Sequence, residues 1–184
     1  MVSRGGPRAA MFGAVLLALA VAARVTSIAS LAEDAEKPRP CSAPEYRQFD
    51  FWLGDWDVFD PGGTRVGTNR IEGILDGCAL AEHWSGAKSS RGTSLNFYSA
   101  GRKRWHQTWI DNQGAPLFLE GEFADGKMTL EGDAPSRRER GSVIRNRITW
   151  SMLEGGRVRQ LWDVSEDGGK TWKVVFDGTY VRKK

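Results

Sequence analysis

The sequence predicts an all-β protein, a roughly ten-stranded antiparallel up-and-down β-barrel with a short N-terminal capping helix. From Asp55 onward apolar and polar residues alternate with a period of two, the pattern of half-buried strands. Turn signals of hairpin length divide these runs, among them "NQG", "ADG", "EGG" and "EDGG". No gap has room for a crossover helix, so we expect antiparallel pairing. Closing such a meander into a barrel removes its edges, and a two-sheet sandwich is the alternative.

The capping helix is expected over 41–54, "CSAPEYRQFDFWLG". Ser42 and Glu45 have the spacing of a capping box, and Gly54 is placed to end the helix. An apolar face along it would be formed by Tyr46, Phe49 and Leu53.

The strands follow from the alternation and the turns between them. They are expected at 55–60, 64–75, 78–85, 91–99, 104–111, 116–123, 127–133, 142–153, 157–165 and 171–182. The faces predicted to point inward are apolar and rich in aromatic residues: Trp56, Val58, Trp105, Gln107, Trp109, Ile144, Ile148, Trp150, Met152, Val158, Gln160, Trp162, Val164, Trp172, Val174, Phe176, Tyr180 and Arg182.

The segment 1–32 has the features of a secretory signal peptide. Two arginines precede an apolar run at 11–23 that is short for a membrane span. Small residues allow cleavage after Ala32 or, earlier, after Ala23. We therefore expect a secreted or periplasmic protein without a membrane span after cleavage, and an uncleaved N-terminal anchor is the alternative.

The net charge of the chain comes from this predicted signal. The sequence has 26 Lys and Arg against 23 Asp and Glu, a formal net charge of +3. Removing residues 1–32 takes away Arg4, Arg8 and Arg24 and no acidic residue, which leaves a neutral remainder. The basic balance is thus no evidence for a nucleic-acid partner.

The remainder divides into a flexible lead-in at 33–40 and a single β-barrel domain at 41–184. Its two cysteines, Cys41 and Cys78, would reach an oxidising compartment on export, so we expect them to form a disulfide. In the chain-entropy model such a bond stabilises the fold by about 3–4 kcal/mol. It would tie the N-terminal segment to the third strand.

Two strands share a Gln-x-Trp pattern, "WHQTWID" at 105–111 and "VRQLWDV" at 158–164. A buried Gln amide without a partner costs about 1–3 kcal/mol. The two glutamines either satisfy one another or the backbone, or they supply the few polar contacts of an aromatic cavity. Trp84 would add a further aromatic wall, and Glu82 would share its face of the strand. The candidate ligand-binding residues are therefore Trp84, Gln107, Trp109, Gln160 and Trp162.

Other motifs carry little chemistry. "SEDGGKTW" at 165–172 fits an Asp-box but occurs once, so we read it as a hairpin turn covered by Trp172. The two histidines, His83 and His106, lie opposite their strands' tryptophans and have no ligand-spaced partner, so no metal site is expected. No P-loop, G-x-S-x-G or dinucleotide fingerprint is present, and no cofactor is expected.

Four stretches together resemble an exported bacterial family of uncharacterised proteins, domain of unknown function 1579. They are "DFWLGDWDV", "GCALAEHW", "GTSLNFYSAGRKRWHQTWIDNQG" and "SEDGGKTWKVVFDGTYVRK", in order along 41–184. That family is similar to the calycins: lipocalins, fatty-acid-binding proteins and nitrobindins. The resemblance implies a calycin-like barrel and no assigned activity.

A lipocalin-like element is the G-x-W of Gly54 and Trp56. In lipocalins this tryptophan plugs the closed end of the barrel against a basic residue of a late strand, a role that would fall here to Arg182. Cation–π packing of this kind contributes about 1–2 kcal/mol. Nitrobindins bind haem through a late histidine, and none follows His106, so haem is not expected.

The functional expectation is a non-catalytic binder of a small apolar or aromatic molecule. One alternative is an enzyme on the same barrel that uses Glu82 or His106 as general base. Another is a purely structural envelope module with a solid core. The presence or absence of a cavity behind the Gln-x-Trp strands distinguishes them.

Overall fold

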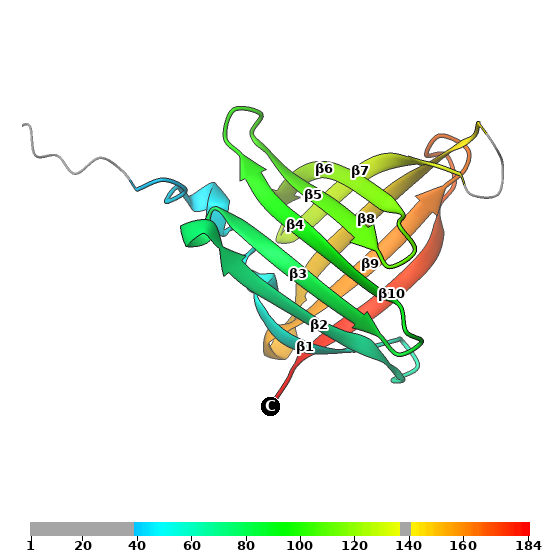
Figure 1. The fold of residues 1–184 in the computed structure, drawn as a ribbon, viewed down its shortest axis with the longest axis horizontal. Coiled ribbons are helices and arrows are strands. Elements are labelled where there is room, and N and C mark those ends of the chain that lie inside the picture. The colour runs from blue at the N-terminus through cyan, green and yellow to red at the C-terminus, as the bar shows by residue number, and fades with distance from the viewer. Residues whose placement is uncertain (1–38, 137–140) are drawn as a thin grey trace, which may run out of the picture. The chain divides into compact units, whose positions relative to one another are not determined.

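The structure, a computed structural model, describes residues 39–136 and 141–184 and shows one closed antiparallel barrel (Figure 1). Each strand pairs with its neighbours in the chain, and β1 pairs with β10 to close the sheet. This confirms the predicted fold and excludes the two-sheet sandwich. The predicted signal peptide at 1–32 and most of the lead-in at 33–40 lie outside the described residues.

The ten strands agree with the predicted ranges to within two residues at either end. They are β1 (Gly54–Phe59), β2 (Arg65–Ile74), β3 (Ala79–Gly86), β4 (Arg91–Ser99), β5 (Arg104–Asp111), β6 (Pro116–Ala124), β7 (Lys127–Pro135), β8 (Val143–Leu153), β9 (Arg157–Ser165) and β10 (Lys173–Arg182).

The predicted short capping helix is present in 3₁₀ form, as two consecutive turns, η1 (Pro44–Arg47) and η2 (Asp50–Trp52). The capping box does not form, because the first turn has no side-chain cap. Residues three apart lie on one side of a 3₁₀ turn, so this geometry brings Phe49 and Trp52 together. Their rings stack 4.9 Å apart and both side chains are fully buried.

The predicted disulfide is present and joins Cys41 to Cys78, just before β3. It closes a loop with a sequence separation of 37 residues. Two further short turns, η3 (Leu75–Gly77) and η4 (Glu154–Gly156), connect β2 to β3 and β8 to β9. Among residues 39–136 and 141–184, no helix has the length and apolar character that a membrane crossing requires.

One end of the barrel is filled by aromatic rings, and we call it the packed end. The Phe49 ring lies 5.6 Å from that of Trp105 and 5.1 Å from that of Trp150, both edge-on. Trp56 is fully buried and donates its indole N–H to the Trp52 carbonyl at 2.9 Å. The N-terminal segment therefore forms part of the core.

Gly54 and Arg182 complete the packed end. The Arg182 guanidinium lies over the Trp56 ring, 4.4 Å from its centroid. Gly54 has φ +129°, and a Cβ atom there would overlap the Arg182 side chain. Glycine is therefore needed at this position for both its backbone conformation and its small size.

The last strand does not keep a single alternation. A bulge between Val174 and Phe176 shifts the register of β10 against β9, so the inward face changes there. Val174 is 53% exposed, contrary to the prediction, whereas Val175, 49% exposed, is the valine that lines the cavity. Trp172 is not inward either: it lies outside the barrel, with the guanidinium of the outward Arg147 3.9 Å above its ring.

Met152 is a further error of the inward prediction. It lies one residue before the end of β8 and is 52% exposed. At the end of a strand, alternation no longer implies burial.

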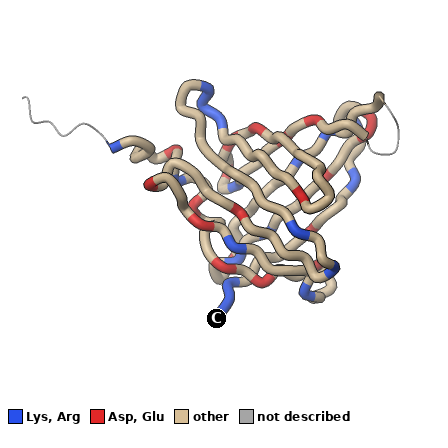
Figure 2. The backbone as a smooth tube through the Cα atoms, in the orientation of Figure 1, with Lys and Arg blue, Asp and Glu red and all other residues tan. Residues whose placement is uncertain are grey.

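Acidic and basic residues are interspersed over the barrel surface (Figure 2). Many pair across neighbouring strands, such as Arg159 with Asp177 at 2.7 Å and Arg145 with Glu131 at 2.8 Å. Exposed pairs of this kind contribute about 0–1 kcal/mol each. The described surface thus carries mixed charge.

Candidate functional site

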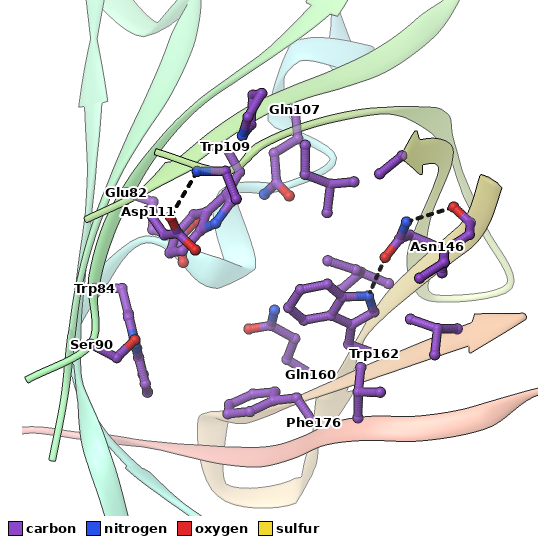
Figure 3. A pocket seen from close by; sticks show the side chains of 18 of the residues that line it. Glu82, Trp84, Ser90, Gln107, Trp109, Asp111, Asn146, Gln160, Trp162 and Phe176 are labelled. Atoms are coloured by element: carbon purple, nitrogen blue, oxygen red, sulfur yellow. Dashed lines mark hydrogen bonds between the residues drawn. The ribbon is translucent and has the colours of Figure 1, made fainter. Parts of the chain in front are cut away.

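The half of the barrel opposite the packed end encloses a cavity of about 580 Å³ (Figure 3). Its rim is formed by the hairpins at that end, including Ser90, Ala115 and Glu166. All five candidate ligand-binding residues line it, from three strands: Trp84 of β3, Gln107 and Trp109 of β5, and Gln160 and Trp162 of β9. Reported ligand pockets span about 300–1,000 Å³, so this volume suits a small organic molecule.

The cavity stays open because its large rings lie over glycines of the barrel wall. Three inward glycines have this role: Gly67 under Trp84, Gly92 under Trp109 and Gly178 under Phe176. A Cβ atom at Gly67 or Gly178 would stand 2.6 Å from the ring above it, closer than real Cβ atoms approach. With hydrogen there instead, the rings fold back against the sheet and leave the interior free.

Two of the wall tryptophans are held in place by contacts with other inward side chains. The Trp162 indole N–H donates to Asn146 Oδ1 at 3.0 Å, and Asn146 Nδ2 donates to the Ile144 carbonyl at 3.1 Å. Trp84 meets the Phe176 ring edge-on, with ring centroids 5.9 Å apart. These walls are thus preformed.

Glu82 is the buried acid of the cavity, 4% exposed. Its Oε1 accepts from Asn69 Nδ2 at 2.7 Å and its Oε2 accepts from Ser94 Oγ at 2.6 Å. Burial raises the pKa of Glu82, while the bonds from Ser94 and Asn69 act in the opposite direction. Within the described residues it forms no salt bridge.

One arm of hydrogen bonds joins Glu82 to Gln107. Strand register places Glu82 opposite Ser94 and Asn96 opposite Gln107. Gln107 Nε2 donates to Asn96 Oδ1 at 2.8 Å, and Asn96 Nδ2 donates to Ser94 Oγ at 2.8 Å. We call this set the Gln107 arm.

A second set, the Gln160 arm, runs from Glu82 through Asn69 and Tyr180. Asn69 Nδ2 also lies 3.3 Å from the Tyr180 hydroxyl, which donates to Gln160 Oε1. Burial, with the nearby Glu82 charge, raises the pKa of Tyr180 well above its ordinary value, so the phenol keeps its proton. Among the described residues, the side chains of Gln107 and Gln160 thus bond to Asn96 and Tyr180, and not to each other.

Sequence reasoning missed the residues that join the two arms: Asn69, Ser94 and Asn96. All three have inward positions in the alternation of their strands. Three buried polar residues on inward faces are the signal that could have revealed the network, but their partners depend on strand register.

The histidines lie on the outer face of the barrel. His83 Nε2 is 3.3 Å from Glu72, and His106 Nδ1 is 3.4 Å from Glu120 with its ring stacked on Phe97. Glu82 and His106 thus lie on opposite sides of the wall. Over the described ranges, no group of three or more His, Cys, Asp and Glu side chains is placed to hold a metal ion.

The Asp-box-like turn is closed by its own side chains. Asp167 accepts from the Thr171 hydroxyl at 2.6 Å and from the Lys170 amide at 2.9 Å. The hydrogen bonds from Thr171 are the main reason why the pKa of Asp167 is lowered. Trp172 covers the turn and donates to the Gly169 carbonyl at 3.1 Å. These contacts make it a structural hairpin.

The fold and cavity define a closed antiparallel β-barrel with an internal pocket. No protein-family model matches the chain, and no curated protein matches it.

Proposed function

We propose that this chain is an exported barrel protein that binds a small apolar or aromatic molecule in its cavity without catalysing a reaction. The observation that carries the proposal is the cavity of about 580 Å³ with Trp84, Trp109 and Trp162 in its walls. Two glutamine amides and one buried acid supply its inner polar groups. A mostly aromatic pocket with a few placed polar groups is typical of small-molecule sites.

The cavity argues against a purely structural module. A barrel that only supports other proteins gains stability from a filled interior, since empty volume costs packing energy. Here Gly67, Gly92 and Gly178 keep large rings out of the lumen. Space preserved in this way supports a binding role.

An enzyme that uses Glu82 as general base is the second candidate, because a buried carboxyl with a raised pKa lines the cavity. Both Glu82 oxygens already accept bonds from neighbouring side chains. His106 lies outside and cannot assist it. These contacts favour binding over catalysis.

The proposal also includes the export of the protein and its family. The disulfide is compatible with a secreted or periplasmic protein. The closed barrel, with Arg182 over Trp56 at its packed end, is compatible with the resemblance to the exported calycin-like family. We therefore retain export and this family as the proposed setting of the binding activity.

The test is an organic extract of the natively purified protein, analysed by mass spectrometry. We expect one small apolar or aromatic compound from the parent and from Trp172→Ala, whose tryptophan lies outside the barrel. Trp109→Ala, which removes a cavity wall, should lose it. An empty extract, together with no response of tryptophan fluorescence to lipids or aromatic compounds, would refute the proposal.

A further inference from the structure

We propose that the ligand is an uncharged, flat molecule with one hydrogen-bond donor and one acceptor, of the aromatic lactam class, bound by Gln107 Oε1 and Gln160 Nε2. This rests on the proposed function, because it names the class of molecule that the cavity takes.

Glu82 fixes the direction of each hydrogen bond in the two arms. Both of its oxygens accept, one from Asn69 Nδ2 and one from Ser94 Oγ. A carboxylate has no proton to give, so Asn69 must present its amide nitrogen and Ser94 its hydroxyl proton. Every other donor in the two arms follows from these two choices.

In the Gln107 arm each group donates toward Glu82. Ser94 Oγ donates its one hydrogen to Glu82, so the same oxygen accepts from Asn96 Nδ2, and Asn96 Oδ1 then accepts from Gln107 Nε2. Gln107 is only 3% exposed, yet its Oε1 has no partner among the described residues. The arm thus ends at the cavity in an acceptor, and a ligand must donate to it.

In the Gln160 arm the order is reversed. The Tyr180 hydroxyl accepts from Asn69 Nδ2, so its own proton goes to Gln160 Oε1. The Nε2 of Gln160 then has no partner among the described residues. Figure 3 shows the side chains of Gln107 and Gln160 reaching into the cavity, which offers an acceptor at one amide and a donor at the other.

The charge of the inner wall excludes anionic ligands. Both glutamine amides are neutral, and Glu82 is the buried acid beside them. The single basic residue among the described lining residues, Lys173, begins β10 at the open end. A fatty acid or aryl carboxylate would meet Glu82 without a compensating cation.

The shape of the walls favours a flat ring system. Trp84, Trp109, Trp162 and Phe176 present ring faces or edges to the lumen. An aromatic body stacks on such walls, and an N–H and C=O on its edge would meet the two amides. A benzo-fused lactam has this combination.

The experiment measures the affinity of the purified full chain by calorimetry for four probes of similar size. 2-Quinolone carries the donor and acceptor, quinoline only an acceptor, naphthalene neither, and 2-naphthoate a negative charge. Each missing hydrogen bond is worth roughly a tenfold change. We expect 2-quinolone to bind about tenfold tighter than quinoline, with naphthalene and 2-naphthoate weaker still.

Variants locate the effect. Gln107→Leu and Gln160→Leu should each weaken 2-quinolone binding about tenfold, the value of the one hydrogen bond removed, while Gln113→Leu, in the β5–β6 hairpin, keeps the full preference. Unchanged naphthalene affinity shows that a variant barrel is folded. The probe series on the unmodified protein decides the question even where a variant does not fold.

The outcomes separate the two proposals. Equal affinity for 2-quinolone and naphthalene, or tightest binding of 2-naphthoate, would overturn the lactam class and leave a binding barrel. Binding of no probe, together with an empty extract from the native protein, would count against the proposed function itself.

Discussion

The two ends of the barrel use the same residue types to opposite effect. At the packed end, the rings of Phe49, Trp52 and Trp150 contact one another and are fully buried. At the open end, the rings of Trp84 and Trp109 lie on glycines and remain half-buried. An inward aromatic residue is therefore core or pocket wall according to what lies beside it on the next strand.

A second difference is what enters each end. The N-terminal segment brings Phe49 and Trp52 into the packed end, and a disulfide holds that segment to the chain before β3. We therefore expect stability to depend mainly on the packed end and ligand affinity on the open end.

The largest expected effect is the loss of a ring from the packed end. Phe49→Ala should lower the free energy of unfolding by about 3–5 kcal/mol, because a fully buried ring in contact with four others leaves a cavity. Phe118→Ala is the control, since that ring is 62% exposed and its loss should change stability by about 0.5 kcal/mol or less. Guanidinium unfolding measures both. Equal losses of stability in the two variants would contradict a main role of the packed end in stability.

Removal of the disulfide should cause the next largest loss of stability. Replacing Cys41 and Cys78 by serine should cost about 3–4 kcal/mol, the loop-closure value for a separation of 37 residues. Because the bond lies at the packed end, the affinity of the folded variant for a cavity probe should stay within about twofold. A large change in affinity at unchanged stability would show that the two ends are coupled.

Glu82 gives a pH-dependent difference at the open end. Its pKa is raised in the folded protein, so the folded state binds its proton more tightly than the unfolded state. The stability contributed by the protonated form is full below the ordinary glutamate pKa and declines as pH rises from about 4 toward the raised value. Glu82→Gln should lack this decline.

The measurement is unfolding of Glu82→Gln and the parent across that pH range. We expect the stability of the variant relative to the parent to rise with pH. Glu122→Gln, on the outer face of β6, is the control and should run parallel to the parent. A constant difference between Glu82→Gln and the parent would contradict the raised pKa.

The smallest change in stability is expected at the glycine under a cavity ring. Gly178→Ala would push the Phe176 ring, whose atoms lie 2.6 Å from the added Cβ, into the lumen. Because side chains alone must move, stability should change by about 1 kcal/mol or less while probe affinity falls severalfold. At Gly132 the added Cβ would overlap the Phe118 carbonyl, so Gly132→Ala should destabilise the barrel far more. Titration calorimetry and unfolding separate the two.

Much of the fold could be predicted because alternation is a local signal. It placed the strands and put Trp84, Gln107 and Trp162 on inward faces. The bulge at Val174 could not be predicted, since neighbouring residues there give no turn signal and the shift is set by pairing with β9. The division of the N-terminal segment into two 3₁₀ turns, with a break at Phe49, likewise has no signal in the residue pattern.

The contacts within the site could not be predicted from the alternation of residues along single strands. The bonds of Glu82 to Ser94 and of Gln107 to Asn96 depend on register between strands. The open space beside Trp109 depends on Gly92, two strand positions away on a neighbouring strand. Cross-strand neighbours of this kind decide whether an aromatic barrel is hollow.

The separation of the two ends has an evolutionary consequence. Most buried rings and the disulfide belong to the packed end. Substitutions around the cavity should therefore reduce the stability of the fold only slightly. The open end can therefore diverge in sequence while the frame persists. Relatives with the same packed end and different residues at the positions of the inner glycines would keep the same fold and bind different ligands.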